Sequence, residues 1–289
     1  MKEISIIGAG GRMGSWFIKY FSNRKDIIIK VYDIDTFSLK GSSNLIVEYT
    51  IKDCVKSSDI VILCVPLKVI PKLIKKCSKL MKPKSILIEI SSIKIKSFDE
   101  LMNINNQIVP ICIHPMFGPG ASILKKLKII IIPIRDRKKE MQIVEKIFPR
   151  SQILEVKNVN IHDHIMAIVL GLTYYINIIF INTLHNENYS DLLALGGTSF
   201  KIQSVISESI LNDEPDLICS LLFDNHFFKK ELVTFNKSIS KYNELINNKN
   251  KKKFLENLNN LKDSIKRFQD LDVSYSKMYK FMNILENYK

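Results

Sequence analysis

The sequence predicts two domains: an α/β domain built on a doubly wound parallel sheet, followed by an all-helical domain. Up to about residue 158, apolar runs typical of buried strands alternate with segments of helical periodicity. A glycine-rich turn, 8-GAGGRMG-14, joins the first strand to the first helix, and beyond residue 158 only helical patterns remain. We therefore place the domains at 1–158 and 159–289, with right-handed crossovers between the strands.

The strands of the first domain are predicted from short apolar runs. The run 59-DIVILCVP-66 is continuously apolar, as expected for a parallel strand that is buried on both faces. Helical periodicity fills the intervals, starting with 15-SWFIKYFSN-23. In chain order we predict strands at 3–7, 27–33, 46–50, 59–66, 85–90, 108–113, 128–134 and 152–157, and helices at 15–23, 68–80, 97–103 and 137–148.

The second domain is predicted to contain helices at 163–184, 189–196, 199–212, 214–248 and 251–286. The first of these includes 165-IMAIVLGLTYYINIIFINTL-184, which has the length of a membrane span. Asn177 and Asn182 lie within it and no second span follows, so we expect a buried central helix and no membrane partner. A helix this apolar needs more cover than one small domain provides. We therefore expect a homodimer in which a second subunit covers part of it.

Composition indicates an ordinary globular protein with a basic bias. Of the 289 residues, 46% are hydrophobic and 25% are charged, and the formal net charge is +14. The lysines are scattered, and no patch combines them with arginine or aromatic side chains that could recognise bases, so no nucleic-acid partner is expected. A basic surface would instead attract an anionic small molecule.

Cysteine usage and the N-terminus indicate the compartment. The 5 cysteines show no CxxC spacing and no paired framework, which favours free thiols in a reducing compartment and no metal site. The N-terminal MKEISIIGAGG runs directly into a strand and a glycine turn, unlike a signal peptide. We therefore expect a cytoplasmic protein.

The glycine-rich turn predicts a Rossmann-like dinucleotide site, because glycines between a strand and a helix let the backbone approach a pyrophosphate at the helix N-terminus. Position 13 is methionine, so the spacing departs from strict GxGxxG, but the required context is present. Asp33 ends the second strand, where its carboxylate would bind ribose hydroxyls and repel a 2′-phosphate, which favours NAD over NADP. Arg12 opposes that preference, because its guanidinium could reach a phosphate or stack on adenine. The predicted cofactor contacts are Gly8, Gly10, Gly11, Arg12, Met13, Gly14, Asp33, Val65 and Pro66, the last two forming a wall at the end of the fourth strand.

The stretch 108-IVPICIHPMFGPGAS-122 places a histidine at the end of an apolar strand. Pro115 follows, and 118-GPG-120 turns the chain, so His114 lies at the carboxyl edge of the sheet, where open α/β sheets bind ligands. Ser92 ends the preceding strand on the same edge. A neutral imidazole there can act as general base toward a substrate hydroxyl, and the serine can orient the same oxygen. We predict His114 and Ser92 as the catalytic residues.

Five motifs, in this order, resemble those of the prephenate dehydrogenase family: GAGGRMG, DIVILCVPL, ISSIK, IHPMFGPG and HDHIMAIVLGLTYY. The resemblance runs from residue 3 to about residue 245, and HPMFGP is its most specific element. It implies NAD(P)-dependent oxidative decarboxylation of prephenate to 4-hydroxyphenylpyruvate in tyrosine biosynthesis, or of arogenate to tyrosine. It also implies a dinucleotide-binding domain followed by a helical dimerisation domain.

The resemblance also implies contacts to the substrate. Ser92 matches the family serine that contacts substrate and cofactor, and Lys94 is either an anion contact or a structural partner. Tyr174 stands where members commonly have histidine, and Lys201 stands where many bacterial members have an arginine that holds the prephenate carboxylate. A tyrosine carries no charge at neutral pH and a lysine lacks the planar fork of arginine, so both positions bear on affinity and on the choice between prephenate and arogenate.

His162 and Asp163 open the long helix of the second domain. We expect His162 to face the cleft between domains, either as a contact to substrate or cofactor or in a structural role. Asp163 suits the first turn of that helix, beside its positive end.

Other readings of the sequence remain open. Dihydrodipicolinate reductase also has a GRMG turn but lacks HPMFGP, and reductases of similar architecture that act on 3-hydroxy acids or imines rely on residues of the helical domain. A non-catalytic dinucleotide sensor would explain Tyr174 and Lys201, whereas intact Ser92 and His114 favour an enzyme.

Overall fold

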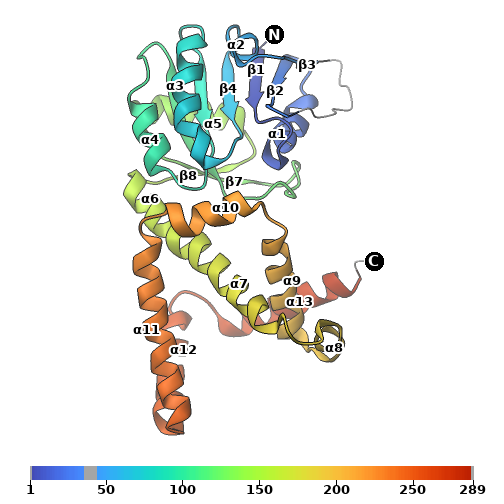
Figure 1. Ribbon diagram of the computed structural model, residues 1–289, viewed down its shortest axis with the longest axis vertical. Helices are drawn as coiled ribbons and strands as arrows, with labels where there is room; N and C mark the ends of the chain where they lie inside the picture. The colour runs from blue at the N-terminus through green and yellow to red at the C-terminus, as the bar shows by residue number, and fades with distance from the viewer. Residues whose placement is uncertain (1, 36–43, 288–289) are drawn as a thin grey trace. The chain divides into compact units, whose positions relative to one another are not determined.

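The computed structural model describes residues 2–35 and 44–287, in two compact units, Met1–Met166 and Ala167–Lys289 (Figure 1). The first unit combines strands with helices and the second is helical, which confirms the predicted fold class. The domain boundary at 158/159 stays a prediction. The compact units divide after Met166, so the helix α6 (Val159–Met166) belongs to the first unit.

The first unit contains one eight-stranded sheet with the strand order β3-β2-β1-β4-β5-β6-β7-β8. The order reverses between β1 and β4, and open α/β sheets bind ligands at such a switch point. The strands are β1 (Lys2–Ile7), β2 (Ile27–Tyr32), β3 (Leu45–Val47), β4 (Ile60–Leu63), β5 (Ile86–Glu89), β6 (Val109–Pro115), β7 (Lys128–Ile131) and β8 (Gln152–Glu155).

One strand pair corrects the prediction of a fully parallel sheet. Within the described strands, β6 and β7 pair antiparallel, whereas the other neighbours pair parallel. A parallel return requires a crossover of a dozen or more residues, usually a helix. Residues 116–127 between β6 and β7 contain no helix, so the chain turns back beside β6.

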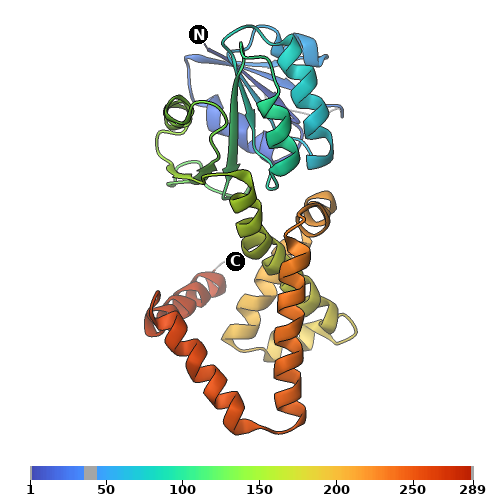
Figure 2. The same ribbon diagram turned by 90° about the vertical axis from the view of Figure 1, so that its left-hand side faces the viewer.

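Helices cover both faces of this sheet, and Figure 2 shows α3 and α4 on one face and α5 on the other. Helix α1 lies on the α5 face, because the Phe17 ring of α1 packs against Phe148, which follows α5, with ring centroids 6.1 Å apart. Every residue of β4 is buried, as expected for a strand between two helical layers. The helices are α1 (Arg12–Ser22), α2 (Ile51–Val55), α3 (Ile70–Leu80, preceded by a 3₁₀ turn at Leu67–Val69), α4 (Ile95–Met102), α5 (Arg137–Ile147) and α6; α2 was not predicted.

In the second unit, α7 packs against α9, α11 against the π-helical segment Ala167–Leu172, and α13 against α9. Asn177, in apolar α7, is buried because its amide oxygen accepts hydrogen bonds from Gln203 (2.7 Å) and Ser207 (2.8 Å) of α9. The helices are α7 (Thr173–Leu184), α8 (Tyr189–Leu195), α9 (Thr198–Leu211), α10 (Pro215–Cys219), the π-helical Ser220–Asp224, α11 (Phe228–Asn247), α12 (Lys251–Lys266) and α13 (Leu271–Glu286).

The long apolar helix is less buried than predicted. Within the described residues, Val159–Leu184 is the one helix whose length and composition would allow it to cross a membrane, with a mean hydropathy of 1.9 over its most apolar window. Only 22% of that window is buried within the chain, and apolar residues such as Ile168, Val169, Ile176 and Ile179 are exposed. The helices of the second unit therefore cover only part of the predicted central helix, and its cover by a second subunit stays a prediction.

Candidate active site

The predicted site residues of the first unit gather at one edge of its sheet. The turn 8–14 follows β1, Asp33 follows β2, and Val65-Pro66 follows β4. Ser92 follows β5, and His114 lies near the end of β6. Because these strands are parallel to one another, their carboxyl ends share the edge where open α/β sheets bind ligands.

The glycine turn is shaped by close contacts within the chain's own backbone. Gly8 has a φ of 85°, in the left-handed region that favours glycine. A Cβ at Gly8 would lie 2.2 Å from the Cys64 carbonyl oxygen, and one at Gly14 would lie 2.1 Å from the Gly8 carbonyl oxygen. Glycine at both positions therefore lets α1 start directly beneath the end of β1.

The helix N-terminus above this turn has the properties of an anion site. Gly11 is the N-cap of α1 and provides no side-chain cap, so the first amides of the helix are oriented toward the edge of the sheet. The backbone N–H of Gly10 donates to Asp33 Oδ2 over 2.8 Å, which places the carboxylate beside the turn. Arg12 is exposed at the start of α1, and Met13 is half-buried. These residues fit a dinucleotide, with its pyrophosphate on the turn and a ribose at Asp33.

His114 is buried at the end of β6, with 4% of its surface exposed. Its backbone is fixed by the sheet, where it pairs with Ile130 of β7. Its Nδ1 lies 3.1 Å from Nε2 of His162 in α6. Within the part of the chain that the structure describes, Nε2 of His114 makes no hydrogen bond.

Both histidines favour the neutral form. Burial, with a smaller contribution from the nearby Lys94 ammonium and from His162, lowers the pKa of His114 well below its ordinary value. Burial also lowers the pKa of His162, although its contact with Asp163 opposes that effect. A neutral buried imidazole has one nitrogen able to accept a proton, as a general base requires.

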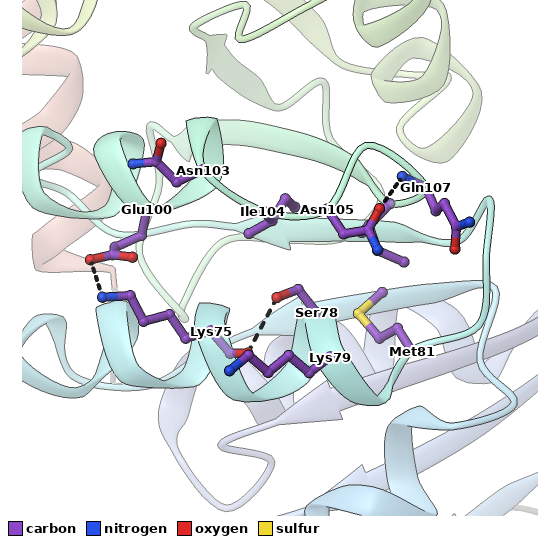
Figure 3. Close-up of a pocket in the computed structure, with 10 residues that line it drawn as sticks. Lys75, Ser78, Lys79, Met81, Glu100, Asn103, Ile104, Asn105 and Gln107 are labelled. Carbon is purple, nitrogen blue, oxygen red and sulfur yellow. Dashed lines mark hydrogen bonds and ion pairs between the residues drawn. The ribbon is translucent and has the colours of Figure 1, made fainter.

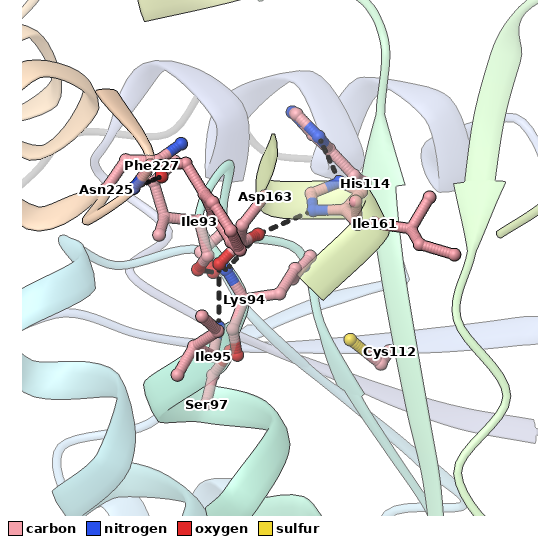
Figure 4. A network of polar contacts seen from close by, with 12 residues as sticks. Ile93, Lys94, Ile95, Ser97, Cys112, His114, Ile161, Asp163, Asn225 and Phe227 are labelled. Carbon is pink, nitrogen blue, oxygen red and sulfur yellow. Dashed lines mark hydrogen bonds and ion pairs between the residues drawn. The ribbon is translucent and has the colours of Figure 1, made fainter. Parts of the chain in front are cut away.

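Asp163 connects α6 to the start of α4 (Figure 4). Its carboxylate accepts hydrogen bonds from the backbone N–H groups of Lys94 and Ile95, each at 3.0 Å, and lies 2.7 Å from Nδ1 of His162. The prediction that Asp163 sits in the first turn of its own helix is wrong, because α6 begins at Val159. The carboxylate instead caps the N-terminus of a different helix.

Lys94 forms a fully buried ion pair with Glu89 of β5 (Figure 4 labels Lys94). Its ammonium donates to Glu89 Oε2 over 2.7 Å and to the Ile113 carbonyl oxygen over 2.6 Å. The Ser91 N–H and the Ser97 hydroxyl complete the shell around the carboxylate. Both side chains are 0% exposed, so Lys94 has the geometry of a structural partner, not that of the substrate contact given as the other alternative.

The remaining predicted site residues differ in whether contacts within the protein already engage their polar side-chain atoms. His162 is 0% exposed and both of its ring nitrogens contact protein atoms, which is not the geometry of a substrate contact. Ser92 is half-buried, and within the described residues its hydroxyl makes no hydrogen bond to protein. In the second unit, the Tyr174 hydroxyl donates to Asp213 Oδ2 over 2.6 Å, and Lys201 is a half-buried residue of α9.

Sequence reasoning missed Glu89 and the true role of Asp163. A signal for Glu89 was present, because a carboxylate that ends the apolar run 85-SILIEI-90 requires a buried partner. Lys94 is close enough along the chain to provide one. No comparable signal linked Asp163 to α4, because the contact joins residues that are far apart in sequence.

A pocket of about 490 Å³ lies elsewhere, between the C-terminal parts of α3 and α4 (Figure 3). Ile108, which precedes β6, lines it, so it lies at the amino edge of the sheet, opposite His114. Lys75 and Glu100 pair across it at 2.9 Å. Within the described residues, no group of three or more His, Cys, Asp or Glu side chains could hold a metal ion.

The turn after β1, with the carboxylate after β2, makes the first unit a nucleotide-binding domain of the doubly wound class. The chain belongs to the prephenate dehydrogenase family. Residues 19–151 match the model of the prephenate dehydrogenase nucleotide-binding domain, and residues 158–260 match that of the prephenate dehydrogenase dimerization domain. The family predicted from the motifs is thereby confirmed.

Known proteins of this kind resemble the chain over most of its length. A probable arogenate/prephenate dehydrogenase of Methanocaldococcus jannaschii is 28% identical over 268 residues, covering 88% of this chain and 58% of that protein, so the chain spans little more than half the length of this relative. A prephenate dehydrogenase from A. aeolicus, crystallised with hydroxyphenyl propionate and NAD⁺, superposes with a TM-score of 0.74 at 23% identity, covering 93% of this chain and 99% of that one. A Synechocystis arogenate dehydrogenase gives a TM-score of 0.67 at 14% identity over 92% of this chain and 100% of that one. These structures share the fold.

Proposed function

We propose that this chain catalyses NAD-dependent oxidative decarboxylation of prephenate to 4-hydroxyphenylpyruvate, as a cytoplasmic enzyme of tyrosine biosynthesis. Family membership supports the reaction class. One structural observation carries the assignment to this chain: a neutral, buried His114 whose Nε2 makes no hydrogen bond within the described residues, at the same sheet edge as the glycine turn. A cofactor sensor would need no such base.

The chemistry requires removal of one proton and precise placement of the reacting groups. Prephenate carries a ring hydroxyl and, across the ring, a carboxylate on a quaternary carbon. His114 Nε2 takes the hydroxyl proton, and Ser92 orients the same oxygen. Bound NAD would accept the hydride from the carbinol carbon, and the ring carboxylate leaves as carbon dioxide while the ring becomes aromatic. Orientation of the two partners alone can lower the barrier by about 7–11 kcal/mol.

The cofactor contacts proposed are the residues of the glycine turn, with Asp33, Val65 and Pro66. Gly8 and Gly14 allow the close backbone packing that forms this turn, because a Cβ at either position would collide with backbone, and the pyrophosphate would lie on the turn so formed. Asp33 lies beside the turn and would repel a 2′-phosphate, so NAD is proposed over NADP. Arg12 is exposed and is the residue that would accommodate NADP if the preference were reversed.

For substrate recognition we propose Lys201, with Tyr174 as a second contact. A lysine ammonium pairs with a carboxylate as a point charge. The Tyr174 hydroxyl is bonded to Asp213, so its orientation is fixed by a carboxylate. Arogenate differs from prephenate in carrying an amino acid in place of the keto acid side chain, and it is the alternative substrate.

We also propose a homodimer formed through the helical unit. The support is the match to a dimerization-domain model together with the exposed apolar residues of the long helix. Sedimentation should give twice the chain mass, and Ile179→Lys, on the exposed surface of α7, should shift the equilibrium toward the monomer. A monomeric wild type would refute this assembly.

The decisive experiment follows the near-ultraviolet absorbance of the reduced dinucleotide. Purified chain is mixed with prephenate or arogenate, each with NAD or NADP, beside a His114→Asn variant. Rapid reduction of NAD by prephenate, lost by about 10²–10⁴-fold in the variant, is the expected result. Turnover of arogenate alone would reassign the substrate. Silence with both substrates, in protein shown to bind NAD, would refute the enzyme and favour the sensor.

A further inference from the structure

Behind His114, hydrogen bonds join His114, His162 and Asp163 in a line that ends at the N-terminus of α4. We call these three side chains the relay. Asp163 contacts His162 Nδ1 at 2.7 Å, and His162 Nε2 contacts His114 Nδ1 at 3.1 Å. All three side chains are buried, at 0%, 0% and 4% exposure. We propose that Asp163 and His162 are positioning residues that fix the tautomer of His114, so that Nδ1 carries the hydrogen and Nε2 carries the lone pair. As a catalytic device the proposal rests on the proposed function, whereas the tautomer itself does not.

The direction of the first hydrogen bond follows from Asp163. Its oxygens already accept the backbone N–H groups of Lys94 and Ile95, at the positive end of α4. Both oxygens therefore act as acceptors toward these N–H groups, and a carboxylate provides only acceptor atoms. Nδ1 of His162 must therefore be the donor.

The second hydrogen bond follows from the first. Burial keeps His162 neutral, so a hydrogen on Nδ1 leaves its Nε2 without one. The 3.1 Å contact then requires His114 Nδ1 to donate to His162 Nε2. With the single hydrogen of neutral His114 on Nδ1, its Nε2 presents a lone pair, which a general base must have.

The same line of contacts stabilises the product of proton transfer. When Nε2 of His114 gains a proton, the positive ring keeps its Nδ1–H directed at the His162 lone pair, with the Asp163 carboxylate behind it. Facing these groups are Lys94 from the segment before α4, which disfavours a positive ring, and Glu89 from β5, which pairs with Lys94. The relay therefore sets the orientation and the tautomer of His114, while burial, with a smaller contribution from Lys94, keeps the resting ring neutral.

The first test reads the tautomer directly, with no substrate. Chain labelled with ¹⁵N in its 5 histidines is examined by NMR at neutral and mildly acidic pH, with His114 identified by loss of its signals in His114→Gln. The expected result is a protonated Nδ1 and an unprotonated Nε2 at His114, and the same pattern at His162. A hydrogen on Nε2 of His114 would overturn the proposal whether or not the chain is a dehydrogenase.

The second test replaces one carboxylate oxygen of Asp163 by an NH₂ group, which should reverse the direction of both hydrogen bonds in the relay. In Asp163→Asn the amide oxygen can still accept the N–H groups of α4, while the NH₂ group donates to His162 Nδ1. His162 would then donate from Nε2, and His114 would carry its hydrogen on Nε2. The analogous exchange behind the histidine of serine hydrolases lowers kcat by about 10⁴-fold, and here we expect a fall of about 10²–10⁴-fold with KM little changed.

The control is Asp136→Asn, because Asp136 caps α5 through the Lys139 N–H in the same unit but is not part of the relay. It should keep the wild-type tautomer and kcat. An Asp163→Asn variant that folds, keeps the wild-type ¹⁵N pattern and retains full kcat would overturn the proposal. If that variant does not fold, the wild-type spectrum decides alone. A wild-type spectrum with the expected pattern but no turnover with either substrate would refute the proposed function and leave the tautomer assignment standing.

Discussion

Replacing Lys94 with methionine should destabilise the first unit strongly. The substitution keeps most of the volume of the side chain but leaves the Glu89 carboxylate buried without its cation, and the Ile113 carbonyl oxygen without its donor. Both Lys94 and Glu89 are 0% exposed, so water cannot replace the lost partner. The Ser91 N–H, the Ser97 hydroxyl and the weakly donating Cys112 thiol remain as compensating donors around Glu89.

Breaking a buried ion pair from one side typically costs about 3–5 kcal/mol, because an uncompensated charge stays in the interior. For a unit of this size each kcal/mol shifts Tm by about 2–4 °C, so Lys94→Met should lower Tm by about 6–20 °C. Removing both charges, in Lys94→Met with Glu89→Leu, should recover most of the loss. The coupling between the two substitutions should therefore be favourable by about 2–3 kcal/mol.

The assay is urea unfolding followed by tryptophan fluorescence. Trp16 is the only tryptophan of the chain and is 3% exposed in α1, so its emission reports on the first unit. The matched control is Lys75→Met, which removes a surface pair whose lysine is 65% exposed and should change stability by less than about 1 kcal/mol. A loss below about 1 kcal/mol in Lys94→Met, or a double variant as unstable as the two single losses added together, would refute the reasoning.

Three further results are expected. Gly14→Ala, whose Cβ would lie 2.1 Å from a backbone oxygen, should lose at least about 1–3 kcal/mol of stability in the same assay, while Gly11→Ala, with 3.4 Å available, should lose much less; equal losses would contradict the close packing of α1 on the turn. Because the pKa of His114 is lowered by burial, its contribution to stability is present above the unfolded value of about 6.5 and is lost as pH falls below it, by up to about 1.4 kcal/mol per pH unit. His114→Gln should therefore show a shallower loss of unfolding free energy on acidification, and an unchanged slope would refute this. A thiol reagent should label exposed Cys219 in the folded chain, whereas buried Cys112, whose thiol pKa is raised by burial, should react only after unfolding; early labelling of Cys112, read by mass spectrometry, would contradict its burial.

Much of the fold could be predicted because periodicity and turn chemistry are local. Apolar runs such as 59-DIVILCVP-66 and the glycine turn identify strands and a helix start within a few residues. The antiparallel pairing of β6 with β7 was missed, because strand direction depends on a missing crossover helix and not on the strand sequence. The extent to which the long helix is exposed in its own chain could not be predicted, because apolar composition predicts that a surface will be covered, but not by which chain.

The site was predicted unevenly for a similar reason. His114 and the residues around Asp33 could be placed at one edge, because the carboxyl ends of parallel strands share that edge. The partners of His114 could not be placed, because His162 and Asp163 reach it from α6, and β7, α5 and β8 lie between β6 and α6 in the chain. Lys94 was left open as an anion contact or a structural partner, because the signal at Glu89 was not connected with it; the buried ion pair makes it a structural partner.

The reversal of the chain after β6 places a loop whose sequence could vary beside a strand that holds His114 in place. Residues on both sides of the reversal are hydrogen-bonded, since the Met116 N–H donates to the Lys128 carbonyl and the Ile132 N–H to that of Cys112. Between these anchors, Gly118 and Gly120 have open space where a Cβ would stand. Insertions at 118–120 should therefore be tolerated, because the backbone that holds His114 is pinned on the sheet and not in the loop. The loop could diversify, by natural variation or by directed evolution, to admit a different molecule without displacing the base.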